Sequence, residues 1–191
     1  MAISLEKGSR IDLTKTNAGL TQLYLGLGWD PAKSFLGSLF GSGNPGSVDL
    51  DGSAILLDSN KNVLDIVYFG KLSSQGIRHS GDNRTGQGDG DDENIVVDLN
   101  QLPANVDSIV FTINSYTGQN FNSVANAKCR IVDNVTKQVI ATYNLSSQGA
   151  HTAIVVGSLY KHGAEWKFRA IGELANGRTA RDLSALAQQL G

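Results

Sequence analysis

The chain has 191 residues, of which 40% are hydrophobic and 18% are charged, as is typical of a globular protein rather than a disordered one. Its formal net charge is −2 at pH 7, and no basic stripe favours nucleic-acid binding. No run of about 18 apolar residues predicts a membrane-spanning helix, and residues 1–10 lack the apolar segment of a secretory signal. We therefore expect one domain, residues 1–191, in a cytoplasmic protein.

Short apolar runs rich in β-branched residues recur along the chain, separated by turn signals. They predict strands at residues 20–27, 48–57, 63–69, 94–99, 106–114, 127–132, 138–144, 151–160 and 165–174. Asn- and Asp-rich turns at 58–62 and 133–137 predict two β-hairpins, because these residues favour tight turns. The pattern predicts an all-β fold, either an antiparallel sandwich or a barrel.

One helix is expected, at the C-terminus. Leu183, Leu186, Ala187 and Leu190 have helical spacing, with Thr179 as the expected N-cap and Gly191 as the terminator. Residues 33–46 are rich in glycine and predict a long loop. Its apolar residues 35–40 either pack on the core or contact a partner.

The most distinctive segment is residues 81–93, which reads Gly-Asp-Asn-Arg-Thr-Gly-Gln-Gly-Asp-Gly-Asp-Asp-Glu. Residues 49–51 and 82–93 together contain seven of the 18 acidic residues and one of the 16 basic residues. These segments therefore carry a charge of −6, while the rest of the chain carries +4. Such a dense group of carboxylates is stable when a cation lies among them, and ligands that are all oxygen favour Ca²⁺ first and Mg²⁺ second.

The acidic segment does not have the ligand positions of an EF-hand loop, because Arg84 and Gly86 occupy the third and fifth positions counted from Asp82. A solvated acidic hairpin without a ligand stays open as an alternative. Asp49 and Asp51 are two residues apart on a predicted strand and so point to the same face. With the glycine-rich loop they could complete one or two oxygen cages, and alone they would be solvent-facing strand residues.

Catalysis has little support in the sequence. His79, His151 and His162 lack metal-ligand spacing, and surface or strand-end positions explain them better, although His79 could support ligands in the acidic loop that follows it. Cys129 is the only cysteine, and strand alternation predicts that it is buried. Core packing is likewise the expectation for the two tryptophans, Trp29 and Trp166. The enzyme alternative is a Mg²⁺- or Mn²⁺-dependent phosphoesterase that uses paired aspartates.

Four segments, at residues 26–30, 49–53, 81–93 and 118–127, resemble the TerD family of tellurium-resistance proteins, and the resemblance covers essentially the whole chain. It implies a calcium-binding β-sandwich in which loops at one end hold two Ca²⁺ ions. The ligands that it implies are Asp49, Asp51, Asp82, Asn83, Asp91, Asp92 and Glu93, with backbone or hydroxyl oxygens from Thr85, Gly86 and Gly88. Asp89 stands at a variable position and is a weaker candidate. Gly52 replaces a frequent alanine, which should not disturb ligation.

The resemblance also implies a biological setting. Members of the family act in tellurite resistance and in bacterial stress responses, through complexes with other Ter proteins near the inner membrane. We therefore expect a non-enzymatic Ca²⁺-binding module that is cytoplasmic or peripheral at the inner membrane through its partners. We expect no nucleic-acid partner and no direct insertion into the membrane.

Overall fold

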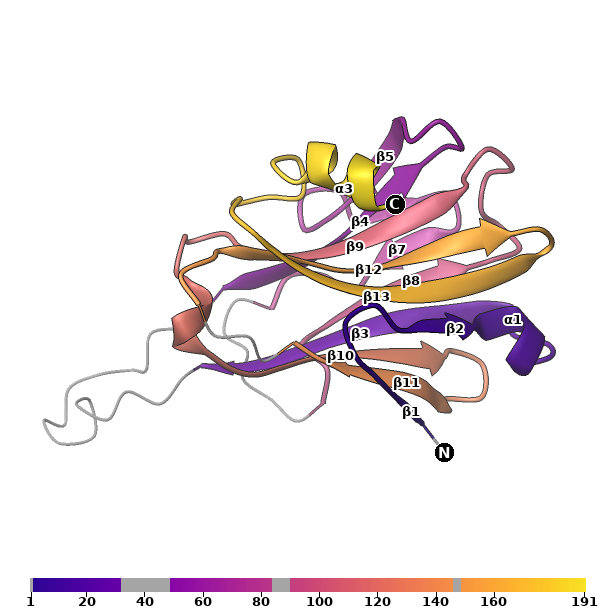
Figure 1. The fold of residues 1–191 in the computed structure, drawn as a ribbon, viewed down its shortest axis with the longest axis horizontal. Coiled ribbons are helices and arrows are strands. Elements are labelled where there is room, and N and C mark those ends of the chain that lie inside the picture. Colours follow the sequence, from indigo (N-terminus) through magenta and orange to yellow (C-terminus); the bar gives the residue numbers. More distant parts are fainter. Residues whose placement is uncertain (1, 32–48, 84–89, 146–148) are drawn as a thin grey trace, which may run out of the picture.

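A computed structural model describes residues 2–31, 49–83, 90–145 and 149–191 of the chain. Two β-sheets pack face to face in it (Figure 1). The first sheet has the strand order β1 (Ile3–Leu5), β11 (Val139–Asn144), β10 (Val124–Asp133), β3 (Gln22–Pro31), β8 (Glu93–Asp98), β7 (Ile77–His79) and β6 (Ser73–Ser74). The second sheet has the order β2 (Arg10–Asp12), β13 (Glu165–Ala175), β12 (Ala153–His162), β9 (Ser108–Ser115), β4 (Leu50–Leu57) and β5 (Val63–Val67). The predicted β-sandwich is confirmed.

The described part of every predicted strand overlaps an observed one, and both predicted hairpins are confirmed as the antiparallel pairs β4–β5 and β10–β11. The described strands pair antiparallel except at one edge, where β1 runs parallel to β11. The short elements β1, β2, β6, β7, α1 (Leu13–Thr16) and the 3₁₀ helix η1 (Phe121–Ser123) were not predicted. They are two to four residues long, which is too short for a hydrophobic period to be read.

The C-terminal helix is confirmed, but its predicted start is wrong. Helix α3 spans Ser184–Leu190, and Thr179 does not cap it. Instead, the Asp182 carboxylate accepts hydrogen bonds from the backbone N–H groups of Arg178 and Thr179 (2.9 and 3.0 Å). This side chain closes a separate turn, so the helix begins only after it. No helix in the described residues is long and apolar enough to span a membrane.

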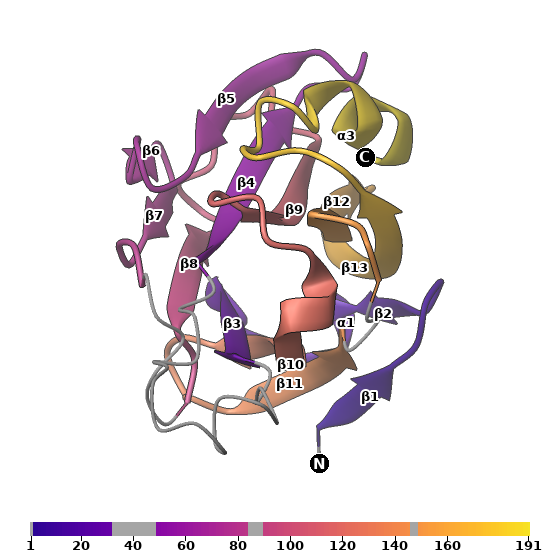
Figure 2. The ribbon, with the colours of Figure 1, turned by 90° about the vertical axis from the view of Figure 1, so that its left-hand side faces the viewer.

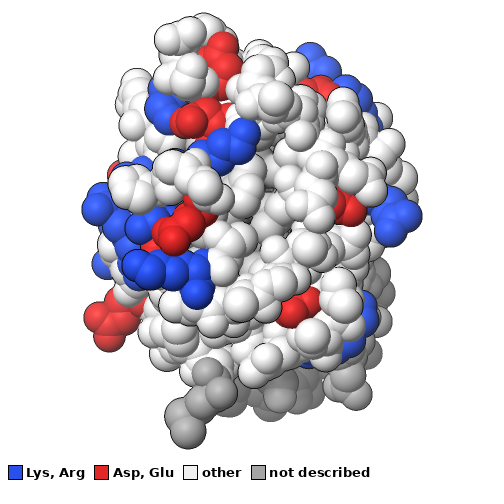
Figure 3. Space-filling view, turned by 90° about the vertical axis from the view of Figure 1, so that its right-hand side faces the viewer, with Lys and Arg blue, Asp and Glu red and all other residues white. Residues whose placement is uncertain are grey.

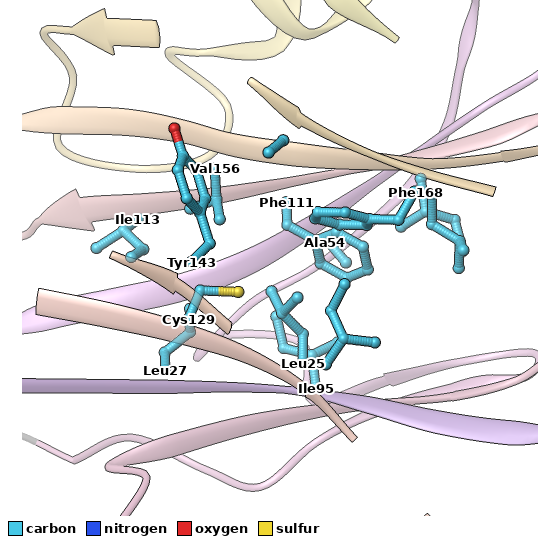
Figure 4. Packing of buried hydrophobic residues seen from close by; sticks show 14 of the residues in the cluster. Leu25, Leu27, Ala54, Ile95, Phe111, Ile113, Cys129, Tyr143, Val156 and Phe168 are labelled. Atoms are coloured by element: carbon cyan, nitrogen blue, oxygen red, sulfur yellow. The ribbon is translucent and has the colours of Figure 1, made fainter. Parts of the chain in front are cut away.

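The main core lies between the sheets (Figure 4). Leu25, Leu27, Ile95 and Cys129 from the first sheet meet Ala54, Phe111, Ile113, Val156 and Phe168 from the second. Both tryptophans and Cys129 are buried, as expected. His162 is exposed at the end of β12, and His79 is at the end of β7 but is buried, so the predicted strand-end position holds for both. The prediction is wrong for His151, which is buried and lies outside the strands.

Strand β4 is covered on both faces, which explains why its sequence does not alternate. Its residues Leu50, Ala54 and Leu56 belong to the main core. Ile55 and Leu57 point to the other face, where they form a second hydrophobic cluster with α3 (Figure 1). A central strand of this kind brings its first residues, and the aspartates there, into a buried position.

Candidate metal centre

The acidic residues lie at the end of the sandwich where β4 and β8 begin, which faces the viewer in Figure 2. Asp49 directly precedes β4, and its carbonyl accepts a hydrogen bond from the Tyr116 N–H (3.2 Å). Asp51 lies within β4 and pairs with Asn114 of β9. The pairing with β9 and the residue that follows it therefore fixes the backbone of both aspartates.

Three carboxylates gather at this point. Asp49, Asp51 and Asp82 each contribute an oxygen, and the three oxygens lie within 4.8 Å of one another. Asp82 is exposed, but Asp49 and Asp51 are only 8% and 4% exposed, so they are not solvent-facing strand residues. The Asp51 Oδ2 atom is buried and accepts no hydrogen bond from the described residues. Buried polar atoms normally have a partner, so this oxygen is available to accept an interaction from a ligand.

Glu93 connects the acidic segment to β4 through a hydrogen bond to Gly52. Its side chain is fully buried, and its Oε2 accepts a hydrogen bond from the Gly52 N–H (2.7 Å). Its Oε1 accepts one from the Asn83 N–H (3.2 Å). His79 places Nε2 3.4 Å from Oε2 and 3.0 Å from the Gly52 carbonyl oxygen. The Gly81 N–H donates to His79 Nδ1 (3.0 Å), so the ring carries its proton on Nε2.

Asp92 joins the acidic segment to β3. Its Oδ2 accepts a hydrogen bond from the Trp29 N–H (2.8 Å), and its backbone N–H donates to the Leu27 carbonyl (2.7 Å). The Asn83 side-chain amide donates to Asp92 Oδ1 (3.0 Å). The side chains of Asn83 and Asp92 are therefore neighbours, and Asn83 directly follows Asp82, a member of the group of three carboxylates.

Asp91 is placed differently from the other predicted ligands. Its carboxylate forms a two-pronged ion pair with Arg130 of β10, with N–O distances of 2.8 and 2.6 Å. A Cβ atom built on Gly26 would lie 2.1 Å from Asp91 Oδ2, so the glycine makes room for this side chain. Asp91 thus lies outside the group of three carboxylates and holds its segment against β3 and β10.

The remaining predicted ligands, Thr85, Gly86 and Gly88, lie in 84–89, outside the described residues, as does Asp89. Gly52 is tightly packed, because a Cβ atom there would lie 2.3 Å from Leu27 Cδ1 and 3.2 Å from Glu93 Oε2. An alanine at this position would require the Leu27 side chain to move.

Burial and the neighbouring carboxylates shift the pKa values of Asp51 and Asp92. Burial, followed by the negative charges of Glu93 and Asp49, raises the pKa of Asp51 to about 7. Burial also raises the pKa of Asp92, against the opposing hydrogen bond from Trp29. Burial lowers the pKa of His79, but the hydrogen bond to Glu93 and the charge of Glu93 outweigh it and raise this pKa overall.

Three features of the site could not be read directly from the sequence. Arg130 gave no signal, because its strand is distant in the sequence and only the fold brings it to Asp91. Gly26 and Gly28 gave a weak signal in the sequence, since glycines on a strand often mark a close approach of another backbone. Gly28 meets such an approach, with the Gly90 carbonyl oxygen 3.0 Å from a Cβ atom built there. His79, two residues before the acidic segment, was expected only as an accessory residue.

Comparison with known proteins places these features in a family. A TerD domain model matches residues 1–190. The chain is 48% identical to tellurium resistance protein TerZ of Serratia marcescens, covering 95% of this chain and 94% of the relative. It is 44% identical to stress response protein SCP2 of Bacillus subtilis, covering 96% and 98% of the two chains.

A solved structure supports the fold. The crystal structure of a homologue of telluride resistance protein (TerD) from Streptomyces coelicolor A3(2) superimposes with a TM-score of 0.71 at 19% identity. The match covers 88% of this chain and 98% of that one. The chain therefore belongs to the TerD domain family, whose members include tellurium resistance and stress response proteins.

Proposed function

We propose that this protein binds two Ca²⁺ ions through the acidic segments at one end of the sandwich. We also propose that it acts without catalysis, as a metal-ordered interaction module in tellurite resistance and the bacterial stress response. The observation that carries the proposal is the group of Asp49, Asp51 and Asp82, in which a buried oxygen of Asp51 has no hydrogen-bond partner among the described residues. Carboxylate oxygens of this kind suit a hard divalent cation.

The proposed ligands divide into two groups. Asp49, Asp51 and Asp82 supply one carboxylate set, and Asn83 and Asp92 are neighbours that could contribute to the second ion. Thr85, Gly86 and Gly88 are proposed to add oxygens from the same loop. Asp91 is proposed to act through its ion pair with Arg130, which holds the loop in place. Burial and, after it, the neighbouring carboxylates raise the pKa of Asp51, and a bound cation would offset the charge of these carboxylates.

The proposed partners are other Ter proteins, in the cytoplasm or in a complex at the inner membrane. Support comes from the relatives, since proteins named TerZ, TerD and TerX of Serratia marcescens are all similar to this chain. A loop surface ordered by metal would offer such proteins a docking face only when Ca²⁺ is bound.

Calorimetric titration with Ca²⁺ at fixed Mg²⁺ concentration, combined with thermal melting, tests the proposal. We expect two ions per chain and a rise in melting temperature, because ligand at 100 times its Kd stabilises the folded state by about 2.7 kcal/mol. In Asp51→Asn the rise should disappear, while the metal-free variant should melt above the metal-free parent, because one buried repulsive charge is gone. Asp107→Asn, at an ion pair elsewhere, is the matched control and should behave as the parent. Equal melting with Ca²⁺ and with chelator would refute calcium binding.

The same variants distinguish the proposed non-catalytic role from the enzyme alternative. A metal-dependent phosphoesterase would hydrolyse phosphate esters with Mg²⁺ or Mn²⁺, and would lose this activity in Asp51→Asn but not in Asp107→Asn. That result would overturn the non-catalytic role.

A further inference from the structure

A cavity of about 570 Å³ lies on the outer face of the second sheet, away from the acidic segments. It is bounded by β2, β13 and β12 and by the residue that follows α3. Lys and Arg side chains gather around this part of the molecule, on the left-hand side of the face in Figure 3, with acidic groups between them. Its charged lining residues are Arg10, Asp12, Lys61, Asp107, Lys161, Lys167 and Arg169.

Strand register places two arginines side by side at the cavity. Arg10 of β2 pairs with Arg169 of β13, and Arg169 pairs in turn with Ser158 of β12. The next residues along these strands, Phe168 and Leu159, point into the core, so the row of three faces outward. Like charges directly opposite on neighbouring strands repel. Two adjacent arginines therefore favour an anion between them.

The acidic residues of the cavity leave these arginines without a carboxylate partner. Asp12 pairs with Lys167 (2.7 Å), and Asp107 pairs with Lys61 (3.3 Å). Arg169 donates a hydrogen bond to the Leu190 carbonyl oxygen, which leaves its charge unbalanced. Within the described part of the chain, the Arg10 guanidinium forms no ion pair.

Ser158 is a second, independent sign of a ligand. Its side chain lines the cavity, it is 1% exposed, and its hydroxyl has no hydrogen-bond partner among the described residues. A buried hydroxyl without a partner destabilises a fold. At the end of a row of two arginines, it supplies the neutral donor that completes an oxyanion site.

We propose that this cavity binds a soluble phosphate monoester. Arg10 and Arg169 bind the phosphate oxygens, because the planar guanidinium matches phosphate with paired hydrogen bonds. The Ser158 hydroxyl donates one more bond. The volume suits a small molecule, and the half-buried Tyr160 lines the side where the organic group would lie. This site does not depend on the calcium proposal, since it shares no residue with the acidic segments.

The test is an NMR titration of the isotopically labelled full chain with phenyl phosphate at constant ionic strength, alongside phenol and benzoate. We expect saturable shifts that map to β2, β12 and β13 with phenyl phosphate only. Arg10→Gln should weaken binding about tenfold or more, the loss typical of a charged hydrogen bond. Arg78→Gln removes the same charge from the other sheet and should leave the affinity unchanged.

Ser158→Ala provides a readout that a purely structural serine would not give. It should weaken phenyl phosphate binding several-fold while leaving the melting temperature equal or higher, because an unsatisfied hydroxyl is removed. The matched control is Ser108→Ala, since Ser108 has an equally unpartnered buried hydroxyl but does not line the cavity. It should keep the parent's affinity.

Three results would overturn the proposal. Shifts that do not saturate, or that persist unchanged in Arg10→Gln and Ser158→Ala, would exclude this cavity as the binding site. Benzoate binding as tightly as phenyl phosphate would exclude phosphate selectivity. Binding to vesicles that contain phosphatidic acid, without binding to phenyl phosphate, would assign the surface to a lipid headgroup instead of a soluble ligand.

Discussion

At the residue scale, Glu93 shows how the acidic segment is built into the fold. A fully buried carboxylate is costly unless hydrogen bonds replace its water. Glu93 accepts such bonds from Gly52 of the second sheet and from Asn83 beside the carboxylate group, next to His79. The Glu93 carboxylate is therefore hydrogen-bonded inside the protein and is not directed toward solvent. Its position makes it a structural support for the ligands as well as a candidate ligand.

Substitution of Glu93 should therefore affect the metal-free protein. We expect Glu93→Gln to lower the free energy of unfolding by about 1–3 kcal/mol, because the new amide group opposes the N–H donors around it. Urea denaturation in chelator measures this change. Glu173→Gln, at an exposed ion pair with Lys7, is the control and should cost less than about 1 kcal/mol. Equal losses in the two variants would contradict the anchoring role.

His151 is a second buried ionisable residue. Its ring stacks on Phe121 with the centroids 4.7 Å apart, and its Nε2 atom has no hydrogen-bond partner among the described residues. Burial lowers the pKa of His151. The unfolded state therefore binds the proton more tightly than the folded state does, and stability is lost as the pH falls below the unfolded value of about 6.5.

A pH series of urea denaturation should reveal this residue. Between pH 7 and pH 5 the parent should lose more stability than His151→Gln, by at most about 1.4 kcal/mol per pH unit for one group. His162→Gln removes an exposed histidine and serves as the control. If the parent and His151→Gln have parallel stability curves over this range, the buried imidazole does not titrate in this way.

At the element scale, β4 contributes to both hydrophobic clusters, which lie on opposite faces of the second sheet. One face packs in the main core and the other lies under α3. The strand that carries Asp49 and Asp51 to the candidate metal centre is thus packed on both faces, which keeps the carboxylates in place despite their repulsion. The partner strand β5 lies at the edge of the sheet and exposes Val63 and Leu64.

The same substitution, leucine to alanine, should destabilise the protein by different amounts in β4 and in β5. Leu57→Ala on β4 should destabilise the protein by about 2–5 kcal/mol, because it opens a cavity under α3. Leu64→Ala on β5 deletes the same atoms at a side chain that is 39% exposed and should cost clearly less. The shifts of the denaturant midpoint, compared at an equal slope of unfolding free energy against denaturant concentration, give both losses of stability. A similar cost at both positions would mean that α3 does not cover β4 in solution.

At the scale of the whole molecule, the acidic segment connects the two layers. Glu93 begins β8 of the first sheet and bonds to Gly52 in β4 of the second, while Asp92 bonds to β3. Cation binding at the proposed metal centre should therefore stabilise both sheets together. The cavity proposed to bind phosphate lies on one outer face, and its proposed phosphate ligands come from β2, β12 and β13 of the second sheet.

The two proposed sites should consequently act independently. We expect Arg10→Gln to leave the calcium affinity within about twofold of the parent, and Asp51→Asn to leave phenyl phosphate binding equally unchanged, because distant sites without shared partners are additive. Calorimetry with each ligand in each variant provides the four values. A reciprocal loss of affinity would show that the sites are coupled through the sandwich.

The residue pattern by itself was sufficient for an all-β fold and for the acidic segments, and the resemblance to the TerD family implied a sandwich rather than a barrel. Apolar runs between turn residues mark the longer strands locally, and a dense group of carboxylates with glycine is visible without any structure. The short strands β1, β2, β6 and β7 were missed because two or three residues carry no period. The start of α3 was misplaced because Asp182 competes for the backbone N–H groups there.

Further properties depend on contacts between residues that are distant in the chain. Only the tertiary structure shows that Asp49 and Asp51 are buried, because burial depends on which strands flank β4. It also separates Asp91, held by Arg130, from the group of three carboxylates. The arginine row arises in the same way, since Arg10 and Arg169 meet through strand register. Local sequence carries the period and the charge of each segment, whereas folding decides which charges become neighbours.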